Sequence, residues 1–550
     1  MSENNPLLQP YDLPPFSAIR PEHVQPAIEQ ILADNRVGIQ NILKDQGQNP
    51  TWAGLVLAMD ELNDRLGAAW SPVSHLNAVC NSSELREAYE ACLPALSAYS
   101  TEMGQNRELF QAFEALAHSP QVAGFDQAQK TILEHSLRDF RLSGIDLPEA
   151  EQKRYAEVQS KLSELGSKFS NQLLDATQAW TKHITDEAAL AGLTDSAKAQ
   201  MAAAAQAKGL DGWLISLEFP SYFPVMTYAQ DRALREEVYA AYCTRASDQG
   251  PNAGKFDNGP VMEEILDLRQ ELAKLLGFAS FAELSLATKM AETPDQVLTF
   301  LRDLAKRSKP FAARDLEQLQ AYASEQGTPE LKSWDTGFFG EKLREQRYSV
   351  SQEALRAYFP IDKVLGGLFA IVQRLYGIEI AEIKGFDTWH PDVRLFEIKE
   401  NGQHIGRFFF DLYARANKRG GAWMDGARDR RRTAAEEQDN IMGRRKSDNE
   451  ELDDAPESAH VKRTAQESFT PEAFIVRRSM PWTENGKSGL MFVAFGRTLN
   501  AFEVQLRRMS GLEDGIIDGL YRYSRPLNGG YYWCPPMKDG RLDLSAVRVL

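Results

Sequence analysis

Residues 155–174 read YAEVQSKLSELGSKFSNQLL, and the apolar side chains in this run recur at steps of three and four. The apolar positions are Tyr155, Val158, Leu162, Leu165, Phe169 and Leu173. A helix with 3.6 residues per turn places them along one face, opposite a face of Lys, Glu, Gln and Ser. Pro148, just inside the expected start, suits a first helical turn. The run therefore predicts a long amphipathic helix.

Helical periodicity dominates the chain from residue 20 to residue 380. A second helix start is Thr293-Pro294-Asp295, where a capping hydroxyl precedes a proline and an acid. The apolar positions that follow it are Val297, Phe300, Leu301 and Leu304. No repeat of fixed period is evident, which argues against a regular solenoid. We expect a stack of amphipathic helices.

The period of the pattern changes near residue 394. The run RLFEIKENGQHIGRFFFDLYAR, residues 394–415, alternates apolar and polar residues around Asn401-Gly402. This dipeptide tolerates a positive φ and suits a tight hairpin turn. The stretch GGAWMDG, residues 420–426, is interpreted as a further strand or a glycine-flanked edge. The sequence thus predicts a small sheet after the helices.

The segment from Ala435 to His460 is polar and acidic, and it is interpreted as an extended connection or surface loop. The elements expected beyond it are a strand over 474–479, a turn at Asn485-Gly486, a strand over 490–495, a helix with Leu499, Phe502, Leu506 and Met509 on one face, and an aromatic strand in RPLNGGYYWCPP, residues 525–536. Residues 435–550 are therefore predicted to form an α+β unit.

Length and composition describe an ordinary globular chain. The 550 residues predict about three folding units. The chain is 43% hydrophobic and 25% charged, close to the globular average. The formal net charge of -16 argues against a general nucleic-acid binder, because a phosphate backbone needs a basic face. We expect no nucleic-acid partner.

Cysteine usage and hydropathy predict a cytoplasmic location. The four cysteines, Cys80, Cys92, Cys243 and Cys534, show neither a CxxC pair nor a zinc-ligand spacing. The N-terminus lacks a basic region followed by an apolar stretch. No segment approaches the roughly 18 apolar residues that a membrane span needs. We therefore expect no membrane association.

Three long segments carry a resemblance to a known family. They are residues 5–28 (NPLLQPYDLPPFSAIRPEHVQPAI), residues 131–177 (TILEHSLRDF onward) and residues 408–430 (FFFDLYARANKRGGAWMDGARDR). In this order they resemble the oligopeptidase A branch of the thimet-oligopeptidase family of zinc metallopeptidases. The resemblance covers residues 1–434. It implies a mostly helical fold with a deep channel that admits short peptides, which a single zinc ion helps to cleave.

The zinc-binding motif that this resemblance implies is missing from the chain. Such a site needs two histidines four residues apart on a helix, with a glutamate between them as general base. The histidines are His23, His75, His118, His135, His183, His390, His404 and His460, and no two stand at that spacing. His135, which follows Glu134, and His404, beside the hairpin turn, are interpreted as structural. Zinc and peptidase activity are therefore not expected, and at most a peptide-binding edge remains at residues 420–426.

A second resemblance begins where the first ends. The segments that carry it are residues 435–463, 474–482 (FIVRRSMPW), 488–511 and 525–544. They resemble the C-terminal part of a dye-decolourising (DyP-type) haem peroxidase. Members of that family fold as two ferredoxin-like α+β domains and hold haem mostly with the second. The resemblance therefore implies a partial ferredoxin-like domain over residues 435–550.

The second resemblance implies functional roles for two residues. His460 matches the proximal histidine that binds haem iron, and Arg477 matches the distal arginine that stabilises charge as the peroxide bond breaks. The family's distal aspartate lies in a GxxDG stretch upstream of the histidine, which this chain lacks. Asp518, within similar letters downstream, is interpreted as part of a surface turn between helices. Weak haem binding and vestigial peroxidase activity are the most that we expect.

The sequence thus predicts a multidomain protein that joins two incomplete enzymes. A mostly α metallopeptidase-like region, residues 1–434, is followed by a partial α+β ferredoxin-like domain, residues 435–550. A fusion error, an assembly artefact or a deliberate chimera would each produce the junction at Ala434–Ala435. Three functions stay open: a weak haem binder with vestigial peroxidase activity, a non-catalytic protein that binds short peptides, and an active zinc oligopeptidase.

Overall fold

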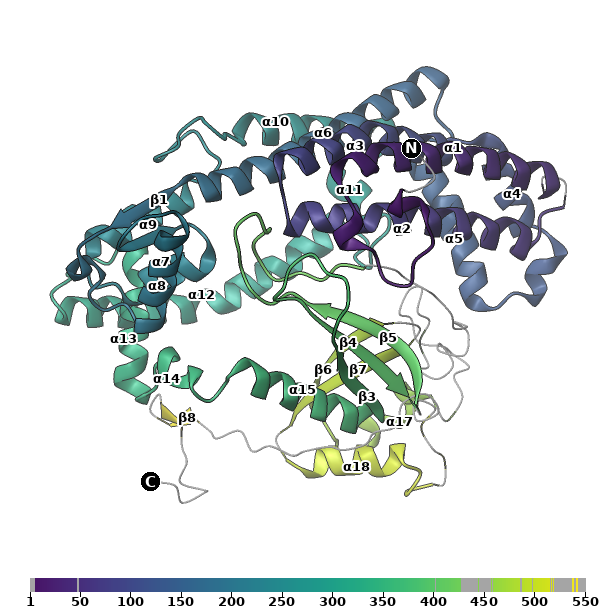
Figure 1. Cartoon of the computed structure of the whole chain (residues 1–550). Helices are drawn as coiled ribbons and strands as arrows, with labels where there is room; N and C mark the ends of the chain where they lie inside the picture. Colours follow the sequence, from purple (N-terminus) through teal and green to yellow (C-terminus); the bar gives the residue numbers. More distant parts are fainter. Residues whose placement is uncertain are drawn as a thin grey trace.

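The computed structural model describes most of the first 426 residues and parts of the remainder (Figure 1). The described residues are 5–46, 49–400, 402–426, 444, 457, 459–484, 487–496, 498–514, 516, 518, 537–538 and 541–542. For residues 476–484 and 487–496 the description covers the backbone only.

Five helices in the first 142 residues pack around one core, at the upper right of Figure 1. They are α1 (Pro21–Gln46), α2 (Ala58–Val79), α3 (Ser83–Gly104), α4 (Arg107–Ala117) and α5 (Gln127–Leu142). Ser82, Asn106 and Asp126 cap three of them, since each side chain accepts a hydrogen bond from a backbone N–H in the first turn. Local sequence therefore fixes where these helices begin.

The long helix that residues 155–174 predict is α6, Glu149–Ala179. Tyr155, Val158 and Leu165 are buried on its inner face, as the periodicity predicts. Leu173, near the end of the same row, is exposed. Helix α6 packs against α3 and against α10 (Gly259–Leu275), so it joins the N-terminal helices to the middle of the chain.

A second core lies at the far end of α6. Its elements are β1 (Thr181–Ile184), α7 (Asp195–Ala207), β2 (Trp213–Ser216), α8 (Phe219–Tyr228) and α9 (Arg232–Cys243). Helix α13 (Thr336–Tyr348) is attached to it through the buried pair of Arg235 and Asp335, whose Nη2 and Oδ1 atoms are 2.7 Å apart. Arg232 donates to the same carboxylate at 2.6 Å. Two guanidinium groups therefore neutralise one buried acid.

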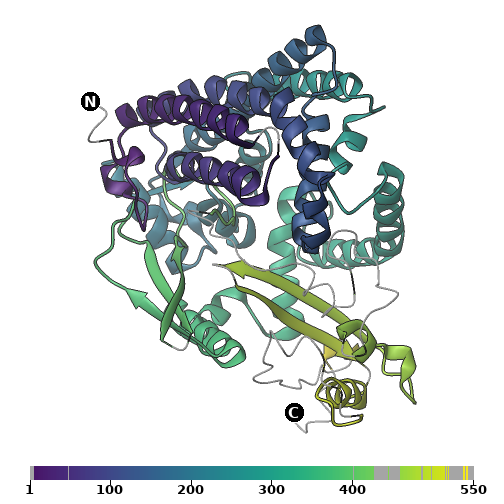
Figure 2. The same ribbon diagram turned by 90° about the vertical axis from the view of Figure 1, so that its right-hand side faces the viewer.

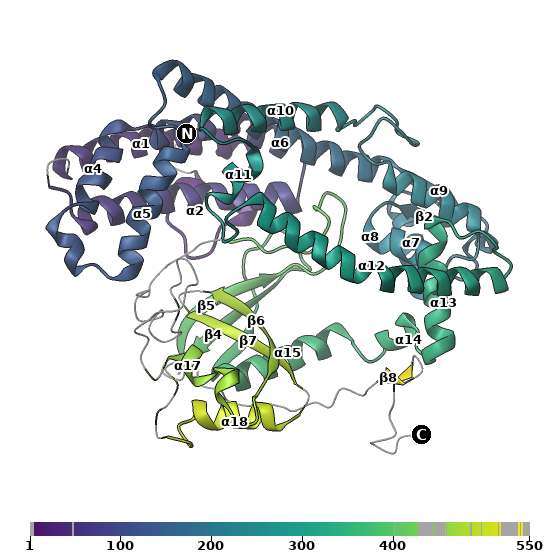
Figure 3. The ribbon, with the colours of Figure 1, turned by 180° about the vertical axis from the view of Figure 1, so that it is seen from behind.

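Helix α12 (Pro294–Glu325) begins as predicted, with the Thr293 hydroxyl accepting from the Gln296 N–H. Its apolar row, however, faces solvent: Phe300 is 67% exposed, and Ala323 is its buried residue. The helix runs from α11 (Phe281–Leu286) to α13 across an open part of the molecule (Figure 3). No described element covers this row, although a periodic apolar pattern ordinarily indicates a buried face.

A three-stranded antiparallel sheet follows α14 (Gln352–Arg356) and α15 (Ile361–Tyr376). Its strands are β3 (Ile378–Ile383), β4 (Arg394–Glu400) and β5 (Gln403–Phe410), in that order. The predicted hairpin is confirmed, and Gly402 adopts a φ of 78° in its turn. Leu395 and Phe396 of β4 are both buried, and as neighbours on a strand they point to opposite faces of the sheet.

The interpretation of residues 420–426 as a strand is wrong. The segment forms no strand, and its residues from Gly421 onward are exposed. A strand needs a partner for its backbone hydrogen bonds, and the described residues show none along this stretch.

The described C-terminal residues form both helices and strands, and a separate α+β domain over residues 435–550 stays a prediction. The described residues contain α17 (His460–Arg463), β6 (Ile475–Glu484), β7 (Lys487–Gly496), α18 (Asn500–Met509) and the short strands β8 (Met537–Lys538) and β9 (Arg541–Leu542). The β6–β7 hairpin is a separate two-stranded sheet that shares no strand with the β3–β4–β5 sheet and stands apart from it in Figure 2. The ferredoxin-like fold stays a prediction, and the predicted aromatic strand, residues 525–536, lies outside the described residues.

The predicted helix is α18, but its apolar row is not its buried side. Leu499 and Leu506 are exposed, whereas Ala501 and Gln505 are buried. Gln505 Nε2 donates to the Ala473 carbonyl at 2.7 Å, so a polar contact orients this helix.

Across the part of the chain that the structure describes, every helix is too short or too polar to cross a membrane.

Candidate functional site

The segment after β5 is fixed by a carboxylate that accepts from three side chains. Asp411 accepts hydrogen bonds from Trp389 Nε1 at 2.9 Å and from Arg415 Nη1 and Nη2 at 2.6 and 2.9 Å. Lys418 Nζ lies 2.9 Å from the same carboxylate. Burial alone would raise the pKa of Asp411, but these donors together lower it to about 2. The acid is therefore ionised at neutral pH.

This segment also closes the end of α2. Arg415 Nη2 donates to the Val79 carbonyl at 3.0 Å, and the Arg419 N–H donates to the Ala78 carbonyl at 2.7 Å. Carbonyls in the last turn of a helix have no partner within the helix, so these bonds complete it. The Asn81 N–H in turn donates to the Asn417 carbonyl at 3.0 Å. Residues 411–419 are thus held to residues more than three hundred positions earlier.

Beyond Arg419 the backbone is open to solvent. A Cβ placed on Gly420 or Gly421 would meet no atom within 4 Å, and Met424 is 95% exposed. Gly421 has a φ of 99°, which L side chains rarely adopt. Segment 420–426 is therefore an exposed, glycine-flanked stretch attached to a rigid base. Sequence reasoning selected the stretch itself but missed Asp411, Arg415 and their partners on α2.

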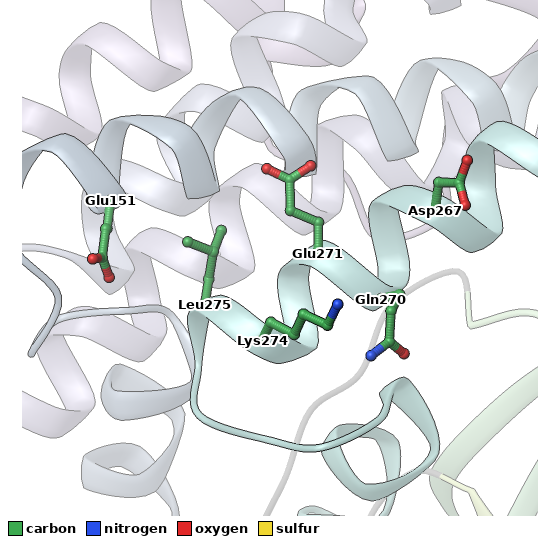
Figure 4. A pocket seen from close by; sticks show the side chains of 6 residues that line it. All are labelled: Glu151, Asp267, Gln270, Glu271, Lys274 and Leu275. Carbon is green, nitrogen blue, oxygen red and sulfur yellow. The ribbon is translucent and has the colours of Figure 1, made fainter.

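A hollow of about 460 Å³ lies between α6 and α10, away from the predicted site residues (Figure 4). Its lining residues are Glu151, Asp267, Gln270, Glu271, Lys274 and Leu275. Arg154 already binds Glu271, with Nε 2.6 Å from Oε1. We therefore assign no site to this hollow.

His460 begins α17, and its imidazole has a carboxylate partner that the sequence did not indicate. Its Nδ1 lies 2.9 Å from Asp518 Oδ2. Asp518 is fully buried, and its N–H donates to the Met509 carbonyl at 2.8 Å. The interpretation of Asp518 as part of a surface turn is therefore wrong. With Nδ1 engaged by a carboxylate, Nε2 is the nitrogen of His460 that could bind a metal.

The neighbourhood of His460 is held by a second ion pair. Arg463 Nη1 lies 2.6 Å from Asp514 Oδ2, and its Nη2 donates to the Arg508 carbonyl at 2.6 Å. These bonds join α17 to the turn after α18. Arg477, the other predicted site residue, has its backbone in β6 opposite Ala494 of β7. Its side chain lies outside the described residues, so its predicted place over the haem opposite His460 stays a prediction.

Comparisons with known proteins support both resemblances. Residues 28–153 match the family Neurolysin/Thimet oligopeptidase, N-terminal domain, and residues 225–449 match Peptidase family M3. Residues 428–539 match Dyp-type peroxidase, C-terminal. The predicted boundary at residue 434 lies inside the overlap of the last two matches and stays a prediction.

Individual relatives extend the first likeness. Oligopeptidase A of Haemophilus influenzae is 55% identical over 434 residues, which are 78% of this chain and 63% of that protein. Oligopeptidase A of Escherichia coli is 55% identical over 423 residues, 76% of this chain and 62% of that protein. The chain thus spans less than two thirds of these relatives. A solved structure of PZ peptidase A with an inhibitor aligns with 59% of this chain and with 48% of its own chain. The sequence identity is 16% and the TM-score is 0.39, so nothing about this protein is inferred from that structure.

These relatives correct the expectation about zinc. Zinc was not expected, yet oligopeptidase A proteins at 55% identity are zinc metallopeptidases. The expectation rested on one missing histidine motif, whereas the similarity to oligopeptidase A extends over 434 residues. Within the described residues, no group of three or more His, Cys, Asp or Glu side chains is placed to hold a metal ion. These residues therefore do not fit zinc, and no zinc-dependent step is derived from them.

Proposed function

We propose that residues 1–434 bind short peptides, and that segment 420–426 is the edge along which an extended peptide lies. The similarity to oligopeptidase A over 434 residues carries this proposal. The geometry supports it, because the segment is exposed while Asp411, Arg415 and Lys418 fix its base. Although the segment is not part of a sheet, its exposed backbone can form hydrogen bonds with the main chain of an extended peptide.

The proposal separates binding from hydrolysis. We assign no bond-breaking step to the described residues, because no metal-ligand group converges among them. In this view the chain unites two incomplete enzymes, with residues 1–434 and 435–550 as separate domains, and acts in the cytoplasm.

Calorimetry tests this function. Purified full-length protein is titrated with short unlabelled peptides of graded length, and its zinc content and its cleavage of a quenched peptide are measured on the same sample. Saturable heat without cleavage supports a peptide binder. Absence of saturable heat with every peptide contradicts the proposal, and zinc-dependent cleavage contradicts the separation of binding from hydrolysis.

A second candidate function concerns residues 435–550. We propose that His460 Nε2 binds haem iron weakly and that peroxidase activity is at most vestigial. The observation in favour is the buried Asp518 carboxylate on Nδ1, since such a partner fixes the orientation of the ring and leaves Nε2 as the nitrogen that can bind a metal. Haem would supply peroxide chemistry when bound, and Arg477 would stabilise the charge that develops.

Haem titration tests this second function. The full-length protein should develop a Soret band that saturates with added haem, and His460→Ala should abolish it. An unchanged spectrum in His460→Ala would exclude His460 as the ligand.

A further inference from the structure

His75 lies where α2 meets segment 420–426. Its ring packs edge-on against Trp389, with centroids 4.4 Å apart, and against Trp423, with centroids 5.9 Å apart. The ring of Phe16 packs against another side of the imidazole, with centroids 5.8 Å apart. The imidazole is consequently 17% exposed, although Trp423 and its neighbours are open to solvent. His75 is therefore a contact between the exposed segment and the packed helices.

The two ring nitrogens of His75 differ in their surroundings. Nδ1 lies 3.4 Å from Asp425 Oδ2, a long hydrogen bond, whereas Nε2 is buried and has no hydrogen-bond partner among the described residues. The neutral ring with its proton on Nδ1 fits this arrangement, because Nδ1–H donates to Asp425 and only a lone pair is left unpaired. A protonated ring would bury a second N–H without an acceptor.

The charged groups that act on His75 all belong to the segment after β5. Asp425 and Asp411 favour the imidazolium, and Arg415 opposes it. Burial is the largest influence, and it holds the pKa of His75 below its ordinary value. The neutral ring is thus the form present at neutral pH, and acidification forces a charge into this contact.

We propose that His75 is the positioning residue of segment 420–426: its neutral imidazole holds Trp423 and Asp425 against α2, and its protonation releases them. This inference rests on the proposed peptide-binding function, which it extends with a dependence on pH. A peptide that lies along the segment would bind most tightly while His75 is neutral, because the edge is then ordered before binding.

The test uses full-length protein labelled with 5-fluorotryptophan, in which Trp423→Phe assigns the fluorine resonance of Trp423. We expect this resonance to titrate with a midpoint below about pH 6.5. In His75→Phe, which keeps the aromatic contact but cannot be protonated, the titration should vanish. A matched control is His404→Asn, because His404 also pairs with a carboxylate, Glu397 Oε1 at 3.0 Å, but on the exposed hairpin. In this control variant the Trp423 resonance should titrate as it does in the unmodified protein.

Peptide affinity, followed by fluorescence anisotropy across the same pH range, gives the second readout. At neutral pH, His75→Phe should weaken binding by about tenfold, the effect of losing one hydrogen bond to a charged group. Its affinity should also lose the pH dependence that the unmodified protein shows.

The two readouts separate this inference from the function on which it rests. A Trp423 resonance that does not titrate, or that titrates equally in His75→Phe, overturns the role of His75 whether or not a peptide binds. A Trp423 resonance that titrates only with His75 present supports it, even where no peptide binds and the proposed function fails. Peptide affinity that is independent of pH in the unmodified protein overturns the link between His75 and binding.

Discussion

Arg415 places both terminal nitrogens of its guanidinium group on the carboxylate of Asp411, at 2.6 and 2.9 Å. The pair is largely buried, and Arg415 extends it to the Val79 carbonyl at the end of α2. A bidentate contact of this kind fixes direction as well as distance. The segment proposed to bind peptides therefore starts from a rigid base.

Removing the negative charge of Asp411 should loosen the base of segment 420–426. Asp411→Asn is expected to cost about 2 kcal/mol of unfolding free energy, because Arg415 and Lys418 would then be partly buried without a counter-ion. Urea denaturation measures the change. The matched control is Asp303→Asn on α12, where Asp303 pairs with Arg307 at the same spacing but both side chains are exposed. A loss below about 0.5 kcal/mol is expected there, and equal losses in the two variants would contradict the account.

The contribution of Asp411 should also depend on pH. Its pKa falls from an ordinary 3.8 to about 2 in the folded protein, so folding favours the ionised form. The stabilisation, about 2 kcal/mol, is fully present above the ordinary pKa and is lost as the pH falls toward about 2. The stability difference between the unmodified protein and Asp411→Asn should therefore shrink over that window. A difference that stays constant down to about pH 2 would show that the carboxylate is not the titrating group.

Asp518 should control haem binding without contacting haem. Asp518→Asn is expected to weaken haem affinity by about tenfold or more, because an amide holds the His460 ring in its orientation less firmly than a carboxylate does. Absorbance titration at the Soret band measures this. His118→Ala serves as the control, since His118 is an exposed histidine that contacts the Glu114 carbonyl. Unchanged affinity in Asp518→Asn would remove the argument that the buried pair supports a ligand.

The exposed row of α12 should tolerate polar residues. Phe300→Ser is expected to change the unfolding free energy by less than about 0.5 kcal/mol, because the side chain is already open to solvent. Phe339→Ser, in the core of α13, should cost about 3 kcal/mol or more. Urea denaturation compares the two. A large loss in Phe300→Ser would show that a surface covers this row in solution.

Local sequence predicted the elements better than it predicted their surroundings. The spacing of Tyr155, Val158 and Leu165 identified the buried face of α6, and Asn401-Gly402 identified the hairpin, because both signals are complete within a few residues. The same type of pattern identified the helix α12, and yet the apolar row of that helix faces solvent. Periodicity shows which side is apolar, but not whether another element covers it.

The site residues were missed for a related reason. Arg415 binds the Val79 carbonyl across 336 positions, and His75 meets Asp425 across 350, so no short motif contains both partners. Asp518 was not given the role of the distal aspartate, because its GxxDG-like stretch follows His460 in the sequence whereas the family's stretch precedes the histidine. Its actual contact, with His460, joins residues 58 positions apart and depends on how α18 turns back.

Photo-crosslinking tests the central claim most directly. A short peptide carrying a photoreactive side chain is irradiated with the full-length protein, and the modified residues are mapped by mass spectrometry. Modification should fall on residues 420–426, compete with unlabelled peptide, and decrease in Asp411→Asn but not in Asp303→Asn. Competed modification confined to other parts of the chain, or none at all, would contradict the assignment of this segment as the peptide-binding edge.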